Sequence, residues 1–270
     1  MTELSIVIVS YNTRDDLGRC LSSLATAPPS TAHEVVVVDN ASTDGSPEAV
    51  SAGHPGVRLL ALERNVGFGP ANNVGIRATS APLLLLLNSD TTVPAGAIDR
   101  LVADLRAHPD VAIVGPRLVD ANGRPEISFG SMMGPVSDAR QKLLGRLYAW
   151  GWAAAVRRVE RLARTAHYPD WVSGACMLAR RTDLEAVGLF DERFFLYTED
   201  VDLCAGVRAR GRRVRFTPVA EVTHLRGQSG RHDRQAVSRA SVESRVAFYR
   251  KHHPRWVPAL RWYLRLTGRR

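Results

Sequence analysis

Short polar clusters follow the apolar runs of this sequence, and they supply its candidate functional groups. The five leucines of Leu83–Leu87 lead directly into Asn88-Ser89-Asp90. A carboxylate at the end of a buried strand is costly unless another group compensates its charge. Asp90 therefore has two open interpretations: it caps the following turn, or it binds a cation. In the second case His224 is the candidate second ligand, because Mg²⁺ commonly takes only one or two protein ligands.

Three earlier apolar runs end in polar clusters of the same kind. In open α/β sheets, ligands bind beyond the carboxyl ends of the strands. Each cluster alone is typical of turns, but four clusters at one edge of a sheet are hard to explain as helix caps and favour a ligand-binding site. Together with Asn88, Ser89 and Asp90, the candidate ligand-binding residues are Ser10, Tyr11, Asn12, Asp39, Asn40, Asn65, Gly67, Phe68, Asn72 and Asn73.

A further group of carboxylates lies in Tyr197–Asp202, at the start of a helical pattern. Acidic residues in a first turn compensate the helix dipole, and this explanation fits Glu199 and Asp200. The alternative is catalytic, since a carboxylate within reach of a substrate hydroxyl can take its proton during attack. Asp200 and Glu199 are the two candidates for such a base.

Strand and helix patterns alternate through the first half of the chain. This repeated order predicts an α/β fold whose mostly parallel sheet carries helices on both faces. Strands are expected over residues 4–9, 35–38, 57–62, 83–87 and 111–114. Helices are expected after Thr13 as N-cap, from Ser46-Pro47, over residues 70–79, and from Pro94 to Leu105.

The second half is less regular, and its elements are predicted one by one. Asn122-Gly123 indicates a hairpin turn. We expect a basic helical stretch over residues 138–165, a helix over 199–210, and strands over 171–179 and 214–222. The predicted domain covers residues 1–225, with a first half (1–115) that carries the candidate nucleotide-binding residues and a second half (116–225) that carries the candidate catalytic acids. Residues 226–270 are predicted to form a basic, helical C-terminal appendage.

Charge is concentrated at the C-terminal end. The chain of 270 residues carries a net charge of +9, yet residues 226–270 alone hold 12 Lys or Arg against two acids. Such a tail fits an anionic membrane surface or nucleic acid, and the absence of any base-reading motif favours the membrane. The three cysteines lack metal-type spacing, which indicates reduced thiols. Strand-like sequence begins at once, so we expect no signal peptide.

The glycines of Gly67-Phe68-Gly69 raise the question of a dinucleotide site. In the nicotinamide fingerprint, the glycines follow the first strand and the acidic ribose partner comes about 20 residues later. Here the order is reversed, because Asp39 precedes the glycines. The sequence therefore disfavours a dehydrogenase, while a nucleotide can still bind beside Asp39.

Several ordered motifs resemble those of the family 2 glycosyltransferases, which are inverting enzymes of the GT-A fold. The resemblance covers residues 3–230. It implies a Rossmann-like α/β sheet that binds a nucleotide-sugar. The matching motifs are Val9-Ser10-Tyr11-Asn12, Val38-Asp39-Asn40-Ala41-Ser42-Thr43-Asp44-Gly45, Asn65-Val66-Gly67-Phe68-Gly69, Asn72-Asn73-Val74-Gly75 and Asn88-Ser89-Asp90.

The resemblance also implies roles for individual residues. Asn88-Ser89-Asp90 stands where the family has its DxD-type metal motif, and only the last acid is kept here. This gives Asp90 the metal role, with His224 as second ligand and Mg²⁺ or Mn²⁺ as the ion. The motif Thr198-Glu199-Asp200 gives Asp200 the role of base, with Glu199 as the alternative. The segment that shapes the acceptor side comprises Trp171, Ser173, Gly174 and Ala175.

Within the family, the motif order is most similar to bacterial rhamnosyltransferases. That similarity implies a dTDP-L-rhamnose donor, or another dTDP- or UDP-sugar, and a glycan or polyprenyl-diphosphate-linked acceptor in cell-envelope synthesis. Basic helices with interleaved aromatics can lie in a membrane interface, so we expect a cytoplasmic protein held peripherally on the inner face of the membrane. A catalytically weak nucleotide-sugar-binding scaffold is the alternative. The oligomeric state stays open, a homodimer included.

Overall fold

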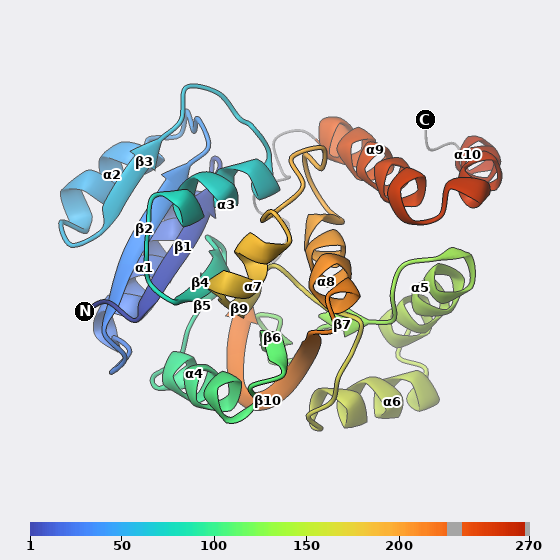
Figure 1. Ribbon diagram of the computed structural model, residues 1–270, viewed down its shortest axis with the longest axis horizontal. Helices are drawn as coiled ribbons and strands as arrows, with labels where there is room; N and C mark the ends of the chain where they lie inside the picture. The colour runs from blue at the N-terminus through green and yellow to red at the C-terminus, as the bar shows by residue number, and fades with distance from the viewer. Residues whose placement is uncertain (226–233, 268–270) are drawn as a thin grey trace.

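The computed structural model describes residues 1–225 and 234–267 (Figure 1). The strands are β1 (Leu4–Ser10), β2 (His33–Asp39), β3 (Arg58–Ala61), β4 (Leu83–Asn88), β5 (Thr91–Thr92), β6 (Val111–Val119), β7 (Phe129–Gly130), β8 (Trp171–Val172), β9 (Cys176–Arg180) and β10 (Arg213–His224). The helices are α1 (Arg14–Thr26), α2 (Ser46–Gly53), α3 (Phe68–Arg77), α4 (Ala97–Ala107), α5 (Pro135–Ala149), α6 (Ala153–Ala163), α7 (Arg181–Ala186), α8 (Glu199–Ala209), α9 (Arg234–His252) and α10 (Val257–Leu266).

The central sheet has eight strands in the order β3-β2-β1-β4-β9-β6-β10-β5. Neighbours β3, β2, β1 and β4 are parallel, as are β6 and β10. Strand β9 runs antiparallel between β4 and β6, and the short β5 runs antiparallel to β10. The predicted mostly parallel α/β sheet is therefore confirmed. β7 and β8 form a separate two-stranded sheet.

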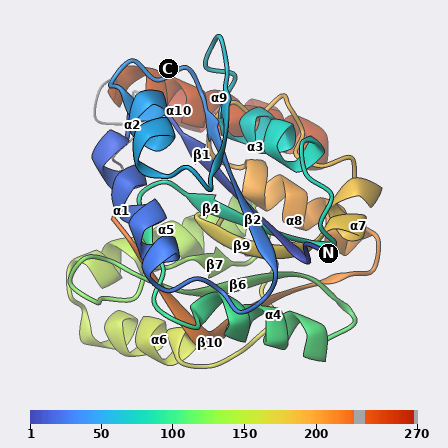
Figure 2. The same cartoon turned by 90° about the vertical axis from the view of Figure 1, so that its left-hand side faces the viewer.

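Helices cover both faces of the sheet because successive strand residues point to opposite sides. In β1, Ile6 and Ile8 belong to a core shared with α1, α2 and α4. Val7 and Val9 belong to the opposite core, shared with α3, α7 and α8. Figure 2 shows the sheet between α1 and α2 on one side and α3, α7 and α8 on the other. This wrapping fixes the carboxyl ends of the parallel strands at one edge.

Two local predictions were wrong, and a third is confirmed only in position. Helix α4 begins at Ala97 and not at Pro94, because Gly96 adopts a left-handed φ of 70° just before it. Thr13 is the N-cap residue of α1 as predicted, but its side chain makes no capping hydrogen bond. The predicted strand 171–179 is split into β8 and β9, since Ser173–Ala175 leave the ladder for other partners.

The second half agrees with the sequence in its remaining elements. A turn forms at Asn122-Gly123, where Val119 and Pro125 form an antiparallel bridge. The basic stretch is helical but breaks into α5 and α6 around Gly151, which has a φ of 74°. No helix among the described residues is long and apolar enough to cross a membrane.

The predicted C-terminal helices are present and pack on the rest of the protein. α5, α6, α9 and α10 gather at the end of the molecule opposite α2 and β3 (Figure 1). Phe248 and Leu264 share an apolar cluster with Phe194 and Val201. Lys251 of α9 also lies 2.7 Å from a carboxylate oxygen of Asp202 in α8. Part of the basic charge in the C-terminal helices is thus neutralised by the protein itself.

Candidate active site

The loops after β1 and β2 are tied together at the sheet edge. Asn12 donates its backbone N–H to Ser42 Oγ at 2.9 Å and accepts the Thr43 N–H through Oδ1 at 2.8 Å. Asp39 accepts the Ser42 N–H through Oδ2 at 2.8 Å. Asp39 Oδ1 is buried and has no hydrogen-bond partner among the described residues. That oxygen can accept a hydrogen bond from a ligand, as expected for a ribose or base contact.

A second loop, residues 62–67, is held to the first by amide pairs. Asn40 donates through Nδ2 to Asn65 Oδ1 at 2.9 Å and accepts the Val66 N–H at 2.9 Å. Gly67 has a φ of 96°, and a Cβ placed there would lie 2.4 Å from the carbonyl oxygen of Phe195. Only glycine fits this close approach of two backbones.

The two asparagines of α3 point toward protein groups. Asn72 donates to the carbonyl of Phe68 at 3.0 Å. Asn73 donates to the carbonyl of Phe190 at 2.9 Å and accepts the N–H of Phe190 at 3.0 Å. These bonds fix the segment before the acidic motif against α3. Direct contact of Asn72 or Asn73 with a nucleotide stays a prediction.

The ends of β1 and β4 are joined through hydroxyls. Thr13 Oγ1 lies 3.0 Å from Ser10 Oγ and 2.8 Å from Ser89 Oγ. Ser10 and Ser89 are buried, whereas Tyr11 is half-buried beside them. The polar clusters that follow β1, β2 and β4 are thus linked by hydrogen bonds. The cluster that follows β3 joins them through the loop of residues 62–67.

Asp90 and His224 meet as the sequence predicts. His224 Nε2 lies 3.3 Å from Asp90 Oδ1, and pairing of β10 with β5 holds the histidine there. The other ring nitrogen, Nδ1, lies 3.1 Å from Glu126 Oε2. Burial lowers the pKa of His224, but the hydrogen bonds to Asp90 and Glu126 outweigh it and raise the pKa to about 9. Such a flanking carboxylate orients a metal-binding histidine.

The residues here fit a hard cation. Asn88 Oδ1 is buried without a hydrogen-bond partner among the described residues, and Asp90 lies two residues away. Amide and carboxylate oxygens with one imidazole suit Mg²⁺ or Mn²⁺. Asp90 and His224 form a pair, and the described residues contain no group of three acidic, histidine or cysteine side chains arranged to hold an ion. The remaining ligands would then be phosphate oxygens and water.

The segment Ser173–Ala175 connects the cation side to the acidic motif. The Gly174 N–H donates to Asp200 Oδ2 at 2.9 Å, and the Ala175 carbonyl accepts the Asn88 N–H at 2.9 Å. A Cβ on Gly174 would lie 3.4 Å from both the Phe68 ring and the Asp200 Cβ. The residues predicted to bind donor and acceptor therefore lie close to the acidic motif in one small region. Trp171 is anchored alongside by a hydrogen bond from Nε1 to the Ser131 carbonyl at 3.0 Å.

The two acids of the motif have different surroundings. Burial raises the pKa of Glu199 to about 8, the charge of Asp200 adds to this, and Glu199 Oε2 has no partner among the described residues. Desolvation also raises the pKa of Asp200, against the opposing effect of N–H donors from Gly174 and Val201. Glu199 thus tends to stay protonated near neutral pH, while Asp200 is held by donors that favour its ionised form.

The backbone just before this motif is strained. Tyr197 and Thr198 both have positive φ values, 66° and 78°. Non-glycine residues in this conformation cost free energy and persist only where surrounding contacts impose them. The strain turns the start of α8 so that Glu199 packs beside Gly69 of α3.

Comparison with known proteins places this geometry in a family. The family model described as glycosyl transferase family 2 matches residues 5–188. The chain belongs to glycosyltransferase family 2. An N-acetylglucosaminyl-diphospho-decaprenol L-rhamnosyltransferase of Mycobacterium tuberculosis is 34% identical over 97% of this chain and 89% of its own length. A pre-mycofactocin glycosyltransferase of the same organism is 29% identical over 82% of this chain and 42% of its own.

Solved structures support the GT-A fold. A mannosyltransferase from Pyrobaculum calidifontis in complex with GDP-Man and Mn²⁺ has a TM-score of 0.63, at 21% identity, over 96% of this chain and 68% of its own. GalNAc-T7 with UDP, GalNAc and Mn²⁺ has a TM-score of 0.61, at 18% identity, over 83% of this chain and 43% of its own. This family 2 glycosyltransferase thus has the fold that its sequence motifs imply.

Glu126 is a residue at this candidate site that the sequence does not indicate. It lies in the irregular segment between β6 and β7, and its partner His224 is 98 residues away. Neither spacing nor periodicity links the two. The only signal in the sequence is an acid placed between apolar segments, which on its own is typical of a surface turn.

Proposed function

We propose that this protein transfers L-rhamnose from dTDP-L-rhamnose, with inversion at the anomeric carbon, to a hydroxyl of a polyprenyl-diphosphate-linked glycolipid. The product would serve cell-envelope glycan synthesis. The relative from Mycobacterium tuberculosis supports the transferred sugar and the acceptor, because its name specifies rhamnose transfer to N-acetylglucosaminyl-diphospho-decaprenol and it matches 97% of this chain. The dTDP group of the donor rests on the motif resemblance.

One observation carries the proposal. Gly174 and Ala175 are adjacent, and they join Asp200 on one side to Asn88 on the other. An acceptor hydroxyl beside Gly174 is then close to a base, while the diphosphate of the donor lies toward Asn88 and Asp90. This arrangement suits direct displacement at the sugar carbon by one base, because the diphosphate is already a good leaving group.

Asp200 takes the proton of the acceptor hydroxyl as its oxygen forms the bond to the anomeric carbon. The bond from that carbon to the diphosphate breaks on the opposite face, so the configuration inverts. Asp90, His224 and Asn88 would hold a divalent cation, which stabilises negative charge on the leaving diphosphate. Asp39 and Asn12 face the nucleoside.

A calorimetric titration tests this function. Wild-type protein is titrated with dTDP, UDP and NAD, each with and without Mg²⁺ or Mn²⁺, and then supplied with dTDP-L-rhamnose and a GlcNAc-diphosphate lipid. Cation-dependent dTDP binding followed by transfer supports the proposal. Binding of NAD alone contradicts the family chemistry, and dTDP binding without turnover supports the scaffold alternative.

We further propose that α5 and α10 dock this enzyme on an anionic membrane. Lys142 of α5 lies 5.3 Å from the ring centroid of Tyr263 in α10, which places the two helices side by side. Leu143, Trp262 and Leu266 are more than half exposed on these helices. Cations together with exposed aromatic and apolar side chains are typical of interfacial helices. Liposomes with anionic lipid should bind the protein and release it in high salt, whereas indifference to lipid charge contradicts the proposal.

A further inference from the structure

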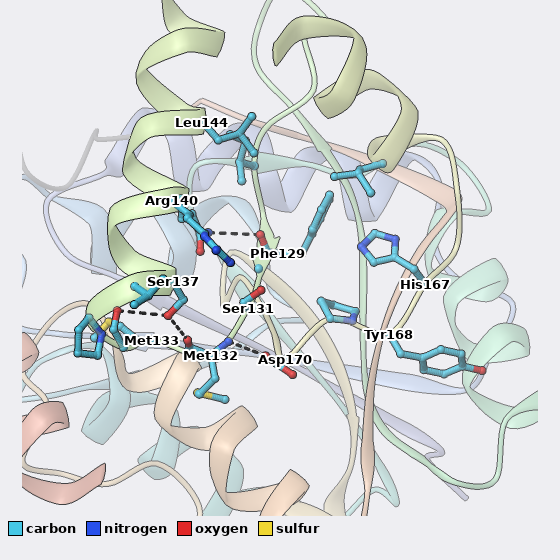
Figure 3. A pocket seen from close by; sticks show the side chains of 18 of the residues that line it. Phe129, Ser131, Met132, Met133, Ser137, Arg140, Leu144, His167, Tyr168 and Asp170 are labelled. Atoms are coloured by element: carbon cyan, nitrogen blue, oxygen red, sulfur yellow. Dashed lines mark hydrogen bonds between the residues drawn. The ribbon is translucent and has the colours of Figure 1, made fainter. Parts of the chain in front are cut away.

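A large hollow lies between α5 and β7, and neither candidate base, Glu199 or Asp200, lines it. Its volume is about 960 Å³, near the upper end of the roughly 300–1,000 Å³ typical of small-molecule sites. Figure 3 shows Arg140 and Leu144 projecting from α5 across the hollow from Phe129 and His167. Further walls come from α6 and the segment after it, from the loop between β7 and α5, and from His253 and Trp256.

The helix above the hollow is attached in an unusual way. α5 has 15 residues and none of them is buried. It is held by polar bonds at its edges: Tyr148 donates to the Pro125 carbonyl at 2.8 Å, and Gln141 donates to the Phe129 carbonyl at 3.4 Å. An amphipathic helix normally buries its apolar face against the core. The inner apolar side of α5 thus faces space that a ligand can fill.

The walls of the hollow are mostly apolar. The apolar side chains that line it include Ile127, Phe129, Met132, Met133, Leu144, Val159 and Leu162. Unbranched methionine adapts to irregular hydrocarbon shapes. Such a lining favours a flexible apolar chain over a polar ligand.

The charges at the hollow are positive. Arg140 from α5 and Arg158 from α6 both line it, and neither has an ion pair or hydrogen bond with any described residue. The carboxylate among the lining residues, Asp170, is already bound by Arg208 and by the N–H of Met132. Two free guanidinium groups beside apolar walls suit a diphosphate attached to a hydrocarbon chain.

The hollow is also close to the proposed point of transfer. Asp170 lines it, and Gly174 binds Asp200 only four residues later. Four residues of extended chain span at most about 14 Å. A sugar joined to a diphosphate can bridge such a gap, with its hydroxyl at Asp200 and its diphosphate toward the arginines. Trp256, which precedes α10, also lines the hollow and connects it to the proposed membrane face.

We propose that this hollow binds the polyprenyl diphosphate portion of the lipid acceptor, with isoprenoid units against the apolar walls and the diphosphate at Arg140 and Arg158. The inference rests on the proposed function for the identity of the acceptor. It adds a recognition site for the lipid that is separate from the nucleotide site.

The test uses farnesyl diphosphate as probe, titrated into the full-length protein by calorimetry. Arg140→Ala and Arg158→Ala should each weaken binding about tenfold, because a charge-assisted hydrogen bond is lost. The matched controls Arg146→Ala on α5 and Arg157→Ala on α6 remove equal charge away from the hollow and should leave binding unchanged. Leu144→Trp, which fills the hollow, should weaken binding at least about tenfold, whereas Leu143→Trp on the exposed side should not.

Several outcomes overturn the inference. If all four arginine variants bind the probe equally well, Arg140 and Arg158 do not recognise the diphosphate specifically, and only the overall positive charge matters. Displacement of the probe by dTDP would place it in the donor site, and inorganic diphosphate binding as tightly as the probe would exclude a role for the chain. Circular dichroism confirms folding, and the arginine variants remain informative if Leu144→Trp misfolds.

Failure of the proposed function looks different. If Leu144→Trp weakens the binding of farnesyl diphosphate but wild-type protein transfers no sugar, the lipid site is supported and the proposed function is contradicted. If transfer occurs with the same KM for long-chain and short-chain acceptors, in wild type and Leu144→Trp alike, the function stands and the lipid site falls.

Discussion

The two sides of the candidate site hold their polar groups in different ways. On the nucleotide side, the side chains of Asn12 and Asn40 are bound to backbone groups of neighbouring loops at 2.8–3.2 Å. On the acceptor side, burial raises the pKa of both neighbouring acids, Glu199 and Asp200. The first arrangement preforms a rigid cradle for a ligand. The second keeps ionisable groups in costly surroundings, where their pKa values shift toward the range useful for proton transfer.

The largest expected effect comes from the acceptor side. Asp200→Asn should lower kcat about a thousandfold or more, because the amide cannot take the proton of the acceptor hydroxyl. Binding of dTDP should be unchanged, since Asp200 contacts the acceptor segment. Rapid-quench transfer assays and calorimetry measure the two quantities. Near-normal turnover in this variant would remove Asp200 from the role of base.

Loss of Asp90, the carboxylate of the Asp90–His224 pair, should give the next largest effect, and it should change both sugar transfer and nucleotide binding. Asp90→Ala should reduce transfer about a hundredfold or more and abolish the dependence of dTDP binding on Mg²⁺ or Mn²⁺, because a carboxylate ligand is lost. Titrations with and without metal check this. Cation-dependent binding that persists in Asp90→Ala would show that the ion is held elsewhere.

The rigid side should respond mainly through stability. Gly67→Ala should lower the free energy of unfolding by about 2–3 kcal/mol, because a Cβ there meets the Phe195 carbonyl oxygen at 2.4 Å in a left-handed conformation. Gly53→Ala is the control, since its Cβ would have no neighbour within 4 Å. Denaturant melts compare the two variants. Equal stability would mean that the loop of Phe195 moves aside freely.

A smaller effect, on the affinity for Mn²⁺, is expected from a change of Glu126, which contacts His224. Glu126→Gln should weaken the apparent affinity for Mn²⁺ about tenfold, because the carboxylate orients His224 through Nδ1. Direct titration of Mn²⁺ in the presence of dTDP measures this. Glu221→Gln removes an exposed carboxylate from the same strand as His224 and serves as control. An unchanged Mn²⁺ affinity in Glu126→Gln would contradict the positioning role.

These two sides also differ in how far the sequence predicts them. The nucleotide side follows from local patterns: apolar runs of strand length end in polar clusters, and parallel strands bring those ends together. On this basis the sequence predicts all four polar clusters at one edge of the sheet. The parallel direction of β1, β2, β3 and β4 is confirmed. Local chemistry decides the structure there.

The acceptor side depends on contacts between distant segments. Strand β9 runs antiparallel between β4 and β6, and nothing within Cys176–Arg180 signals that direction. Glu126 meets His224 across 98 residues, and α9 docks through Lys251 on Asp202. The charge count predicts a basic tail, but it does not predict that Lys251 forms an ion pair with Asp202 and so neutralises part of that charge. Such long-range contacts form only in the assembled fold, and no periodic pattern in the sequence indicates them.

The smallest predicted effect distinguishes the two acids of the motif. Glu199→Gln should leave kcat within about threefold, because a glutamate whose pKa is raised to about 8 is already protonated near neutral pH. Its raised pKa means that the folded state resists ionisation, so wild type loses stability as pH rises from about 4.5 to about 8. The variant should therefore match wild type at pH 4 and exceed it by up to about 4 kcal/mol at pH 8. Denaturant melts across this range measure the difference; a pH-independent difference, or a collapse of kcat, would make Glu199 the ionised base in place of Asp200.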